Sequence, residues 1–189
     1  MKARENPFAP GRMERVLPFD PELVGTTWQE IESRWESLGR RACVVGHHGA
    51  GKTTFLDGFE RRLCGRVPVV RLFFNRSKRR LEPEDLEKLG DLGGKCLLVD
   101  GDRHLPLRDR IELWHGARKA SGVVSARHRA GRLPVLLGLR SNPQLAESLL
   151  GRACPKEAAE FRELLPALLR RHRGNIRNVW LECYDRWAG

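Results

Sequence analysis

Five short apolar runs mark the chain, with segments of helical spacing between and after them. The runs occupy residues 41–45, 67–74, 95–100, 122–126 and 133–137. Continuous apolar runs of this length are typical of strands that are covered on both faces of a sheet. We therefore expect five strands with helices between them, which is an α/β organisation.

Apolar residues at intervals of three and four predict the helices. The predicted helices cover residues 27–38, 54–63, 83–89, 107–120, 142–150, 156–171 and 175–187. The helix at 107–120 carries Ile111, Leu113, Trp114 and Ala117 as its apolar residues. Strand signals cease after Arg140, and residues 1–25 are rich in proline with interspersed apolar residues. We expect an N-terminal arm at 1–25, a core at 26–140 and a C-terminal helical lid at 141–189.

One motif carries the strongest chemical signal. Residues 46–53 read Gly-His-His-Gly-Ala-Gly-Lys-Thr, which fills the phosphate-loop pattern G-x-x-x-x-G-K-[ST] between a predicted strand and a predicted helix. Glycines let backbone N–H groups curl around phosphates, and the lysine reaches the β- and γ-phosphates. We expect a nucleoside triphosphate, ATP, to bind here. The candidate nucleotide-binding residues are Gly46, His47, His48, Gly49, Ala50, Gly51, Lys52, Thr53 and Thr54.

A carboxylate follows the third apolar run. Asp100 ends that run, so it is predicted at the carboxyl end of a buried parallel strand. In phosphate-loop proteins such an acid organises the shell of the Mg²⁺ that the threonine hydroxyl holds. Thr53 and Asp100 are therefore the candidate metal residues, and Mg²⁺ is the expected ion.

The order of these elements resembles the ATPase branch of the phosphate-loop superfamily that contains the AAA+ proteins. The resemblance implies a P-loop NTPase three-layer fold, with a five-stranded, mainly parallel sheet and a small C-terminal helical lid. It also implies a polar sensor of the γ-phosphate after the fourth strand, for which Ser125 and His128 are candidates. The stretch 171–177 resembles the Gly-x-x-Arg opening of AAA+ lid helices, so Arg177 is the candidate second sensor. The chain, including its 6–8 arm, also resembles bacterial ATP-binding proteins of unassigned role.

The chain departs from the AAA+ pattern at one catalytic position. AAA+ ATPases usually place a glutamate directly after the magnesium aspartate, whereas this chain has Gly101 there and Asp102 next. Hydrolysis is then slow, uses Asp102, or needs a partner. The candidate catalytic residues are Lys52, Asp100, Asp102, Ser125, His128 and Arg177.

Three other functions fit parts of the pattern. A small-molecule or nucleotide kinase would use the arginines of the 127–132 loop to clamp the transferred phosphoryl group. A non-hydrolysing ATP-binding scaffold would explain Gly101. A GTPase is disfavoured because no N-K-x-D tetrad is present, and the D-x-x-G at 91–94 precedes a strand.

The charge balance points to an anionic partner. The 189 residues include 35 basic and 24 acidic side chains, for a net charge of +11. Such a balance favours nucleic acid as a partner, beside the nucleotide itself. A protein partner or further copies of the chain would supply an arginine finger, for which the candidates are Arg127, Arg129, Arg132 and Arg152.

The cysteines and the hydropathy add two expectations. The five cysteines are scattered singly, without the paired spacing of zinc sites, so we expect reduced structural thiols. No apolar stretch approaches the roughly 20 residues that span a bilayer, and no signal-type apolar core follows the N-terminus. We expect a cytoplasmic protein without a membrane partner.

Overall fold

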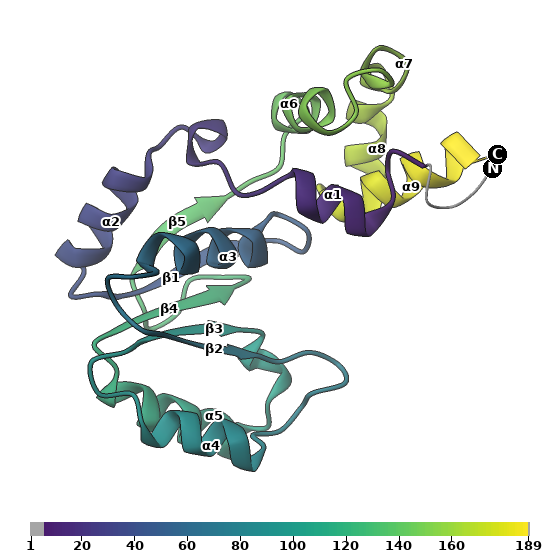
Figure 1. The fold of residues 1–189 in the computed structure, drawn as a ribbon. Helices are drawn as coiled ribbons and strands as arrows, with labels where there is room; N and C mark the ends of the chain where they lie inside the picture. The colour runs from purple at the N-terminus through teal and green to yellow at the C-terminus, as the bar shows by residue number, and fades with distance from the viewer. Residues whose placement is uncertain (1–5, 189) are drawn as a thin grey trace. The chain divides into compact units, whose positions relative to one another are not determined.

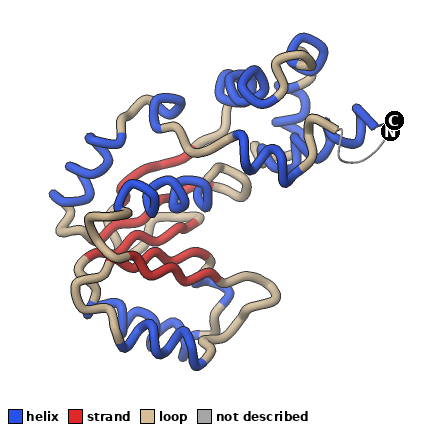
Figure 2. Tube along the Cα trace, in the orientation of Figure 1, coloured by secondary structure: helices blue, strands red, loops and turns tan. Residues whose placement is uncertain are grey.

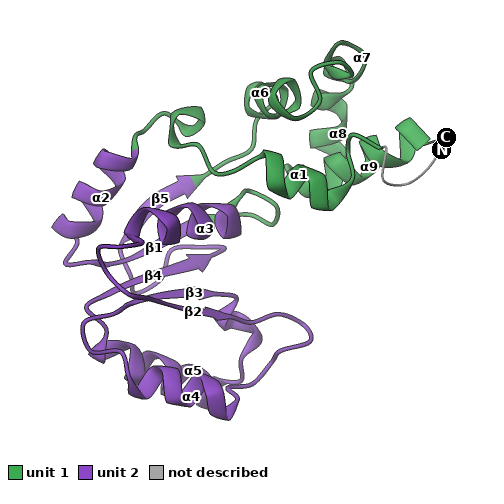
Figure 3. Cartoon of the chain, viewed as in Figure 1, with its two compact units in different colours: residues 1–27, 46–51, 139–189 green, residues 28–45, 52–138 purple. Residues whose placement is uncertain are grey.

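The computed structural model describes residues 6–188, which divide into two compact units (Figure 3). The sheet unit comprises residues 28–45 and 52–138, and the terminal unit comprises the described parts of 1–27, 46–51 and 139–189. The helices and strands of both units are coloured by type in Figure 2. No helix within residues 6–188 is long and apolar enough to cross a membrane.

The sheet unit is built on a five-stranded parallel sheet, as the apolar runs predicted (Figure 1). The strands are β1 (Arg41–Gly46), β2 (Val69–Phe73), β3 (Cys96–Asp100), β4 (Gly122–Arg127) and β5 (Val135–Leu139). They lie in the order β2-β3-β4-β1-β5. Every residue of β3 is buried, which explains why its sequence is an unbroken apolar run before its final aspartate.

Helices cover both faces of this sheet (Figure 1). α2 (Trp28–Ser37) and α3 (Lys52–Leu63) lie on one face, and α4 (Pro83–Gly90) and α5 (Leu107–Gly116) lie on the other. The short turns η2 (Asp102–His104) and η3 (Ala117–Lys119) flank α5. α5 buries Leu113, whereas Ile111, another apolar residue of the predicted helix, is 62% exposed.

The parallel register aligns the carboxyl ends of the strands. Asp100 of β3 pairs with Ala126 of β4, and Phe73 of β2 pairs with Asp100. On the other side of β4, Val45 of β1 pairs with Arg127. The ends of these four neighbouring strands therefore lie along one edge of the sheet, where ligands bind in open α/β folds.

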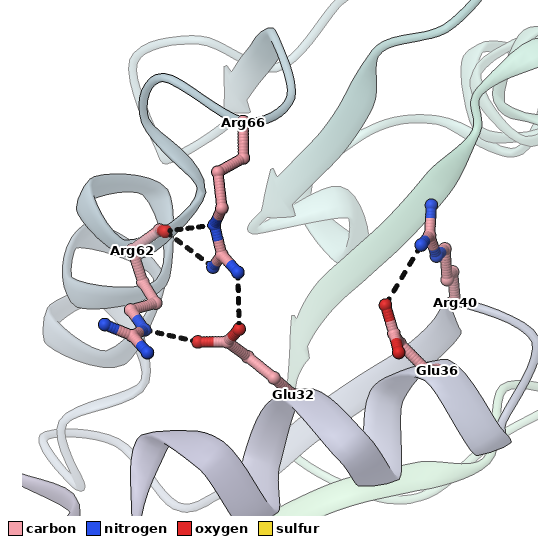
Figure 4. Close-up of polar contacts among 5 residues, drawn as sticks. All are labelled: Glu32, Glu36, Arg40, Arg62 and Arg66. Carbon is pink, nitrogen blue, oxygen red and sulfur yellow. Dashed lines mark hydrogen bonds and ion pairs between the residues drawn. The ribbon is translucent and has the colours of Figure 1, made fainter.

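An ion-pair cluster ties α2 to α3 (Figure 4). Glu32 of α2 accepts hydrogen bonds from Arg62 of α3 and, at 2.8 Å, from Arg66 just after α3. A second ion pair joins Glu36 of α2 to Arg40, which follows the helix, with 3.0 Å between Oε1 and Nη2. Aromatic rings of the two helices also pack together, with the Trp35 and Phe59 centroids 5.2 Å apart.

The terminal unit is helical and has its own apolar core. Its elements are α1 (Pro10–Val16), η1 (Pro21–Val24), α6 (Pro143–Ala153), α7 (Ala158–Arg162), α8 (Leu165–Arg171) and α9 (Ile176–Ala188). The single helix predicted at 156–171 is interrupted, which gives α7 and α8. Phe8 is fully buried against Phe161, with ring centroids 4.7 Å apart, so the N-terminal segment completes this core.

The cysteines differ sharply in accessibility. All five are free thiols; Cys64 is exposed, and Cys43, Cys96, Cys154 and Cys183 are buried. Burial raises the pKa of Cys96 and of Cys183 to about 12 and that of Cys154 to about 11. At pH 8 we expect Ellman's reagent to titrate one thiol per native chain, and five after denaturation. Cys64→Ser should leave none in the native chain, and more than one fast thiol would contradict the buried placement.

Glu182 makes part of the terminal unit sensitive to acid. It accepts hydrogen bonds from Arg186 (2.8 Å), His172 (2.6 Å) and Arg171 (2.7 Å), and these contacts lower its pKa to about 2. The pKa of Glu182 in the folded chain lies below its ordinary value of 4.5. The stabilisation of the fold by these contacts is therefore complete above pH 4.5 and disappears as the pH falls toward 2. Glu182→Gln should lower the thermal midpoint at pH 7, and its difference from wild type should vanish near pH 2. Glu160 is exposed and pairs with no basic side chain among residues 6–188, so Glu160→Gln should leave the thermal midpoint unchanged at both pH values.

Candidate functional site

The phosphate loop joins β1 to α3. Residues 46–51 belong to the terminal unit, and Lys52 and Thr53 begin α3 in the sheet unit. Gly49 has φ of +71°, and a Cβ there would lie 1.9 Å from Oδ1 of Asn175. This position therefore needs glycine both for its backbone conformation and for the close approach of Asn175.

Asn175 directly precedes α9 and was not identified as a site residue from the sequence. Its Oδ1 accepts a hydrogen bond from the N–H of Asn178 at 3.2 Å, which caps the helix. Gly174 beside it lies against the ring of His47, since a Cβ at 174 would come within 3.1 Å of that ring. The turn before α9 therefore packs on the phosphate loop within the terminal unit. The signal in the sequence was the Gly-Asn pair ahead of a helical segment.

Thr53 and Asp100 come together in the sheet unit. The hydroxyl of Thr53 donates a hydrogen bond of 2.7 Å to Oδ2 of Asp100, which is 9% exposed at the end of β3. Burial lowers the pKa of the neighbouring Lys52, with Asp100 opposing the shift and Arg103 adding to it. A positive side chain, a hydroxyl and a carboxylate thus gather where α3 begins.

This donor set fits Mg²⁺. Among residues 6–188 there is no group of three or more His, Cys, Asp or Glu side chains that could hold a metal ion alone. Mg²⁺ in phosphate-transfer sites needs none, because it takes one or two oxygen ligands from the protein and the others from phosphates and water. The hydroxyl of Thr53 and the carboxylate of Asp100 are hard oxygen donors of that kind.

The residue after Asp100 has a conformation that excludes a side chain. Gly101 has φ of +80°, and a Cβ on it would lie 2.0 Å from the carbonyl oxygen of Phe74. Phe74 cannot withdraw easily, because its own N–H donates to the carbonyl of Asp100 at 2.9 Å. The place of the usual AAA+ glutamate is therefore sterically closed in this chain.

Asp102 is buried just beyond this turn and is held by two side chains. Its Oδ2 accepts hydrogen bonds from Nε1 of Trp114 and from Nη2 of Arg127, each at 3.1 Å. The guanidinium of Arg127 also lies over the Trp114 ring, 4.9 Å from the centroid. Neither contact was predicted from the sequence, where Trp114 was named only as an apolar residue of the 107–120 helix, and Arg127 as a candidate arginine finger and as part of the 127–132 loop.

The two candidate sensors after β4 differ in accessibility. Ser125 is fully buried, and its Oγ lies 3.4 Å from Nε of Arg127, which donates to it. His128 follows the last residue of β4 and is half-buried. In the sequence Arg127 lies between the two candidates, and its guanidinium is the group that contacts Ser125.

Arg177, the candidate second sensor, is the second residue of α9. Its Nη2 lies 3.1 Å from Oε1 of Glu14 on α1, and both side chains are largely exposed. Among the other candidate arginines, Arg129 and Arg132 are exposed, and Arg152 pairs with Asp20. The roles of these residues stay predictions.

Positive charge collects near the end of β3. Burial and the nearby Arg103, Arg79 and Arg76 all lower the pKa of His104, and Asp100 opposes them. The three arginines are exposed. They follow the ends of β2 and β3, which are paired neighbours in the sheet.

Comparisons with known proteins bear on the fold. No protein-family model matches the chain, and no curated protein matches it. Forty-one chains of solved structures match it. One is the crystal structure of Cdc6p from Pyrobaculum aerophilum, with a TM-score of 0.51 and 15% identity over 86% of this chain. The match spans 63% of the Cdc6p chain. With the strand order above, this likeness confirms the predicted class: the chain has the α/β fold of P-loop NTPases.

Proposed function

We propose that the chain is an ATP-binding ATPase of the AAA+ type that depends on Mg²⁺. The observation that carries the proposal is the 2.7 Å contact between Thr53 and Asp100, because it unites the phosphate-loop hydroxyl with the carboxylate of a buried strand. Lys52, next to Thr53, supplies the positive charge for the β- and γ-phosphates. When bound, Mg²⁺ would neutralise charge on those phosphates, with Thr53 and Asp100 as its protein ligands.

The partner proposed for this ATPase is nucleic acid. The net charge of +11 and the exposed Arg76, Arg79 and Arg103 beside the strand ends support it. Such a surface attracts the phosphate backbone through counterion release. A protein partner or further copies of the chain would instead supply the missing catalytic group in trans.

A second candidate function follows from Gly101. Since no glutamate fits there, a non-hydrolysing ATP-bound switch is the alternative function. Phosphate release, measured with and without DNA, separates the two. Release that DNA raises several-fold supports the ATPase, and tight ATP binding without release under either condition supports the switch.

Removing the phosphate-loop lysine should weaken nucleotide binding. We expect Lys52→Ala to lower the affinity for ATP by at least about tenfold, because one charge-assisted contact to the phosphates is lost. Thr53→Ala in Mg²⁺ and wild type in EDTA should show similar losses, as both remove the metal contribution. Titration calorimetry measures the affinities, and Lys119→Ala, at an exposed lysine of the same unit, is the matched control. Unchanged ATP affinity in Lys52→Ala would refute the proposed site.

Placing a glutamate at position 101 should not produce the usual AAA+ catalysis. Gly101→Glu and Gly101→Ala both place a Cβ against the carbonyl of Phe74 in a left-handed conformation, so each should lower the free energy of unfolding by about 3 kcal/mol. Urea denaturation measures the change. Gly93→Ala is the control, because a Cβ at Gly93 meets no atom within 4 Å. A stable Gly101→Glu chain with faster ATP hydrolysis would contradict this account of the turn.

A further inference from the structure

The outer side of α5 carries two apolar side chains that are left largely exposed. Leu107 is 68% exposed and Ile111 is 62% exposed, the highest values of any large apolar residue among residues 6–188. Figure 1 shows α4 and α5 against one face of the sheet, with no further element of the sheet unit outside them. The buried side of α5 is formed by Leu113, which shares a core cluster with Leu89 of α4. The two exposed residues are therefore not needed to pack α5 on its own unit.

The two exposed residues are neighbours on the helix surface. Leu107 and Ile111 are four positions apart in α5, so their side chains lie next to each other along the helix. A single exposed apolar residue is common on a protein surface, whereas adjacent ones form a continuous apolar area. We name this pair the α5 stripe. An apolar surface that covered the α5 stripe would remove both side chains from water, which is favourable.

Arginines flank the α5 stripe on both sides. Arg110 lies one turn from Leu107, and Arg108 lies one turn from Ile111 on the other side of the stripe. Both arginines are exposed, and neither forms an ion pair within residues 6–188. The α5 stripe is therefore an apolar strip with a positive rim.

The acidic residues nearby do not neutralise this rim. Oδ2 of Asp109 accepts a hydrogen bond of 2.9 Å from the N–H of Leu81, so this carboxylate is directed to the loop before α4. Glu112 is exposed and lies one turn from Gly116, where a Cβ would meet Leu89 of α4 at 3.2 Å. The free acid of α5 is therefore on the side of the helix that faces α4, beyond the rim.

This combination of groups distinguishes between possible occupants. Nucleic acid would pair with the arginines, but its bases stack on aromatic rings and guanidinium planes and would leave the aliphatic side chains uncovered. A second copy of the chain, docked through the same surface, would set arginines against arginines, which is unfavourable. An acidic amphipathic helix supplies apolar side chains for the α5 stripe and carboxylates for its rim.

We propose that the α5 stripe and its two flanking arginines are a docking surface for an acidic amphipathic helix of a partner protein. Apolar residues one turn apart on that helix would cover Leu107 and Ile111. Carboxylates beside them would pair with Arg108 and Arg110, and these charged contacts would select the partner. The inference goes beyond the proposed ATPase and does not depend on it, because no residue of the phosphate loop takes part.

A designed peptide tests this surface directly. The probe is a fluorescein-labelled peptide of about three heptads, with leucine at a and d and glutamate at e and g, where like charges oppose self-pairing. Its counterpart carries lysine in place of each glutamate. Fluorescence anisotropy with the full chain, without nucleotide, should show that the acidic peptide binds at least about tenfold more tightly than the lysine peptide. Added salt should reduce this difference, because it screens the exposed charges.

Substitutions separate the apolar stripe from its rim. The double variant Leu107→Gln/Ile111→Gln should lower the affinity for the acidic peptide by about tenfold or more, because the apolar contact is lost. Arg108→Glu/Arg110→Glu should reverse the preference, so that the lysine peptide binds more tightly. Leu181→Gln, at a 42% exposed leucine of α9, is the matched control and should bind as wild type does. All these side chains are exposed, so thermal melts should match wild type and show that each variant folds.

Three outcomes overturn the proposal. Wild type that binds neither peptide, or binds both equally well, does not recognise an acidic helix. If wild type sediments as a dimer that Leu107→Gln/Ile111→Gln dissociates, the α5 stripe is covered by a second copy of the chain. If a labelled oligothymidine loses as much affinity in that double variant as the acidic peptide does, the surface belongs to nucleic acid.

Discussion

The register that β4 shares with β3 and β1 is the constraint on which the candidate site depends. It sets Ala126 beside Asp100 and Arg127 beside Val45, so the strand that bears the carboxylate and the strand that leads into the phosphate loop end together. A slip of one residue would turn each side chain to the opposite face of the sheet. A slip of β3 by one residue, about 3.3 Å, would also break the 2.7 Å hydrogen bond between Thr53 and Asp100.

A backbone conformation, and not only a side chain, distinguishes this chain from the usual AAA+ pattern. The left-handed turn at Gly101 lies against the carbonyl of Phe74, and the following residue enters the short helix η2. That path carries Asp102 into contact with Trp114 and Arg127. The missing glutamate and the unusual placement of the next acid therefore have one cause.

Local signals predicted the sheet and the phosphate loop, and long-range contacts account for what they missed. Buried parallel strands are continuous apolar runs, so all five strands were found from hydropathy, and the structure brings together Thr53 and Asp100, which motif spacing singled out. The packing of Phe8 on Phe161 joins segments far apart in the sequence, which no local periodicity reveals. The ion pair of Asp102 with Arg127 likewise depends on β3 and β4 being neighbours.

Neighbouring side chains support the ion pair between Arg127 and Asp102. Breaking a largely buried ion pair is costly when it leaves an uncompensated charge. The carboxylate of Asp102 also accepts a hydrogen bond from the indole N–H of Trp114, and the guanidinium of Arg127 lies over the Trp114 ring and donates to Ser125. Each charged group therefore has a second partner, which gives Trp114 a reason to be tryptophan beyond its packing.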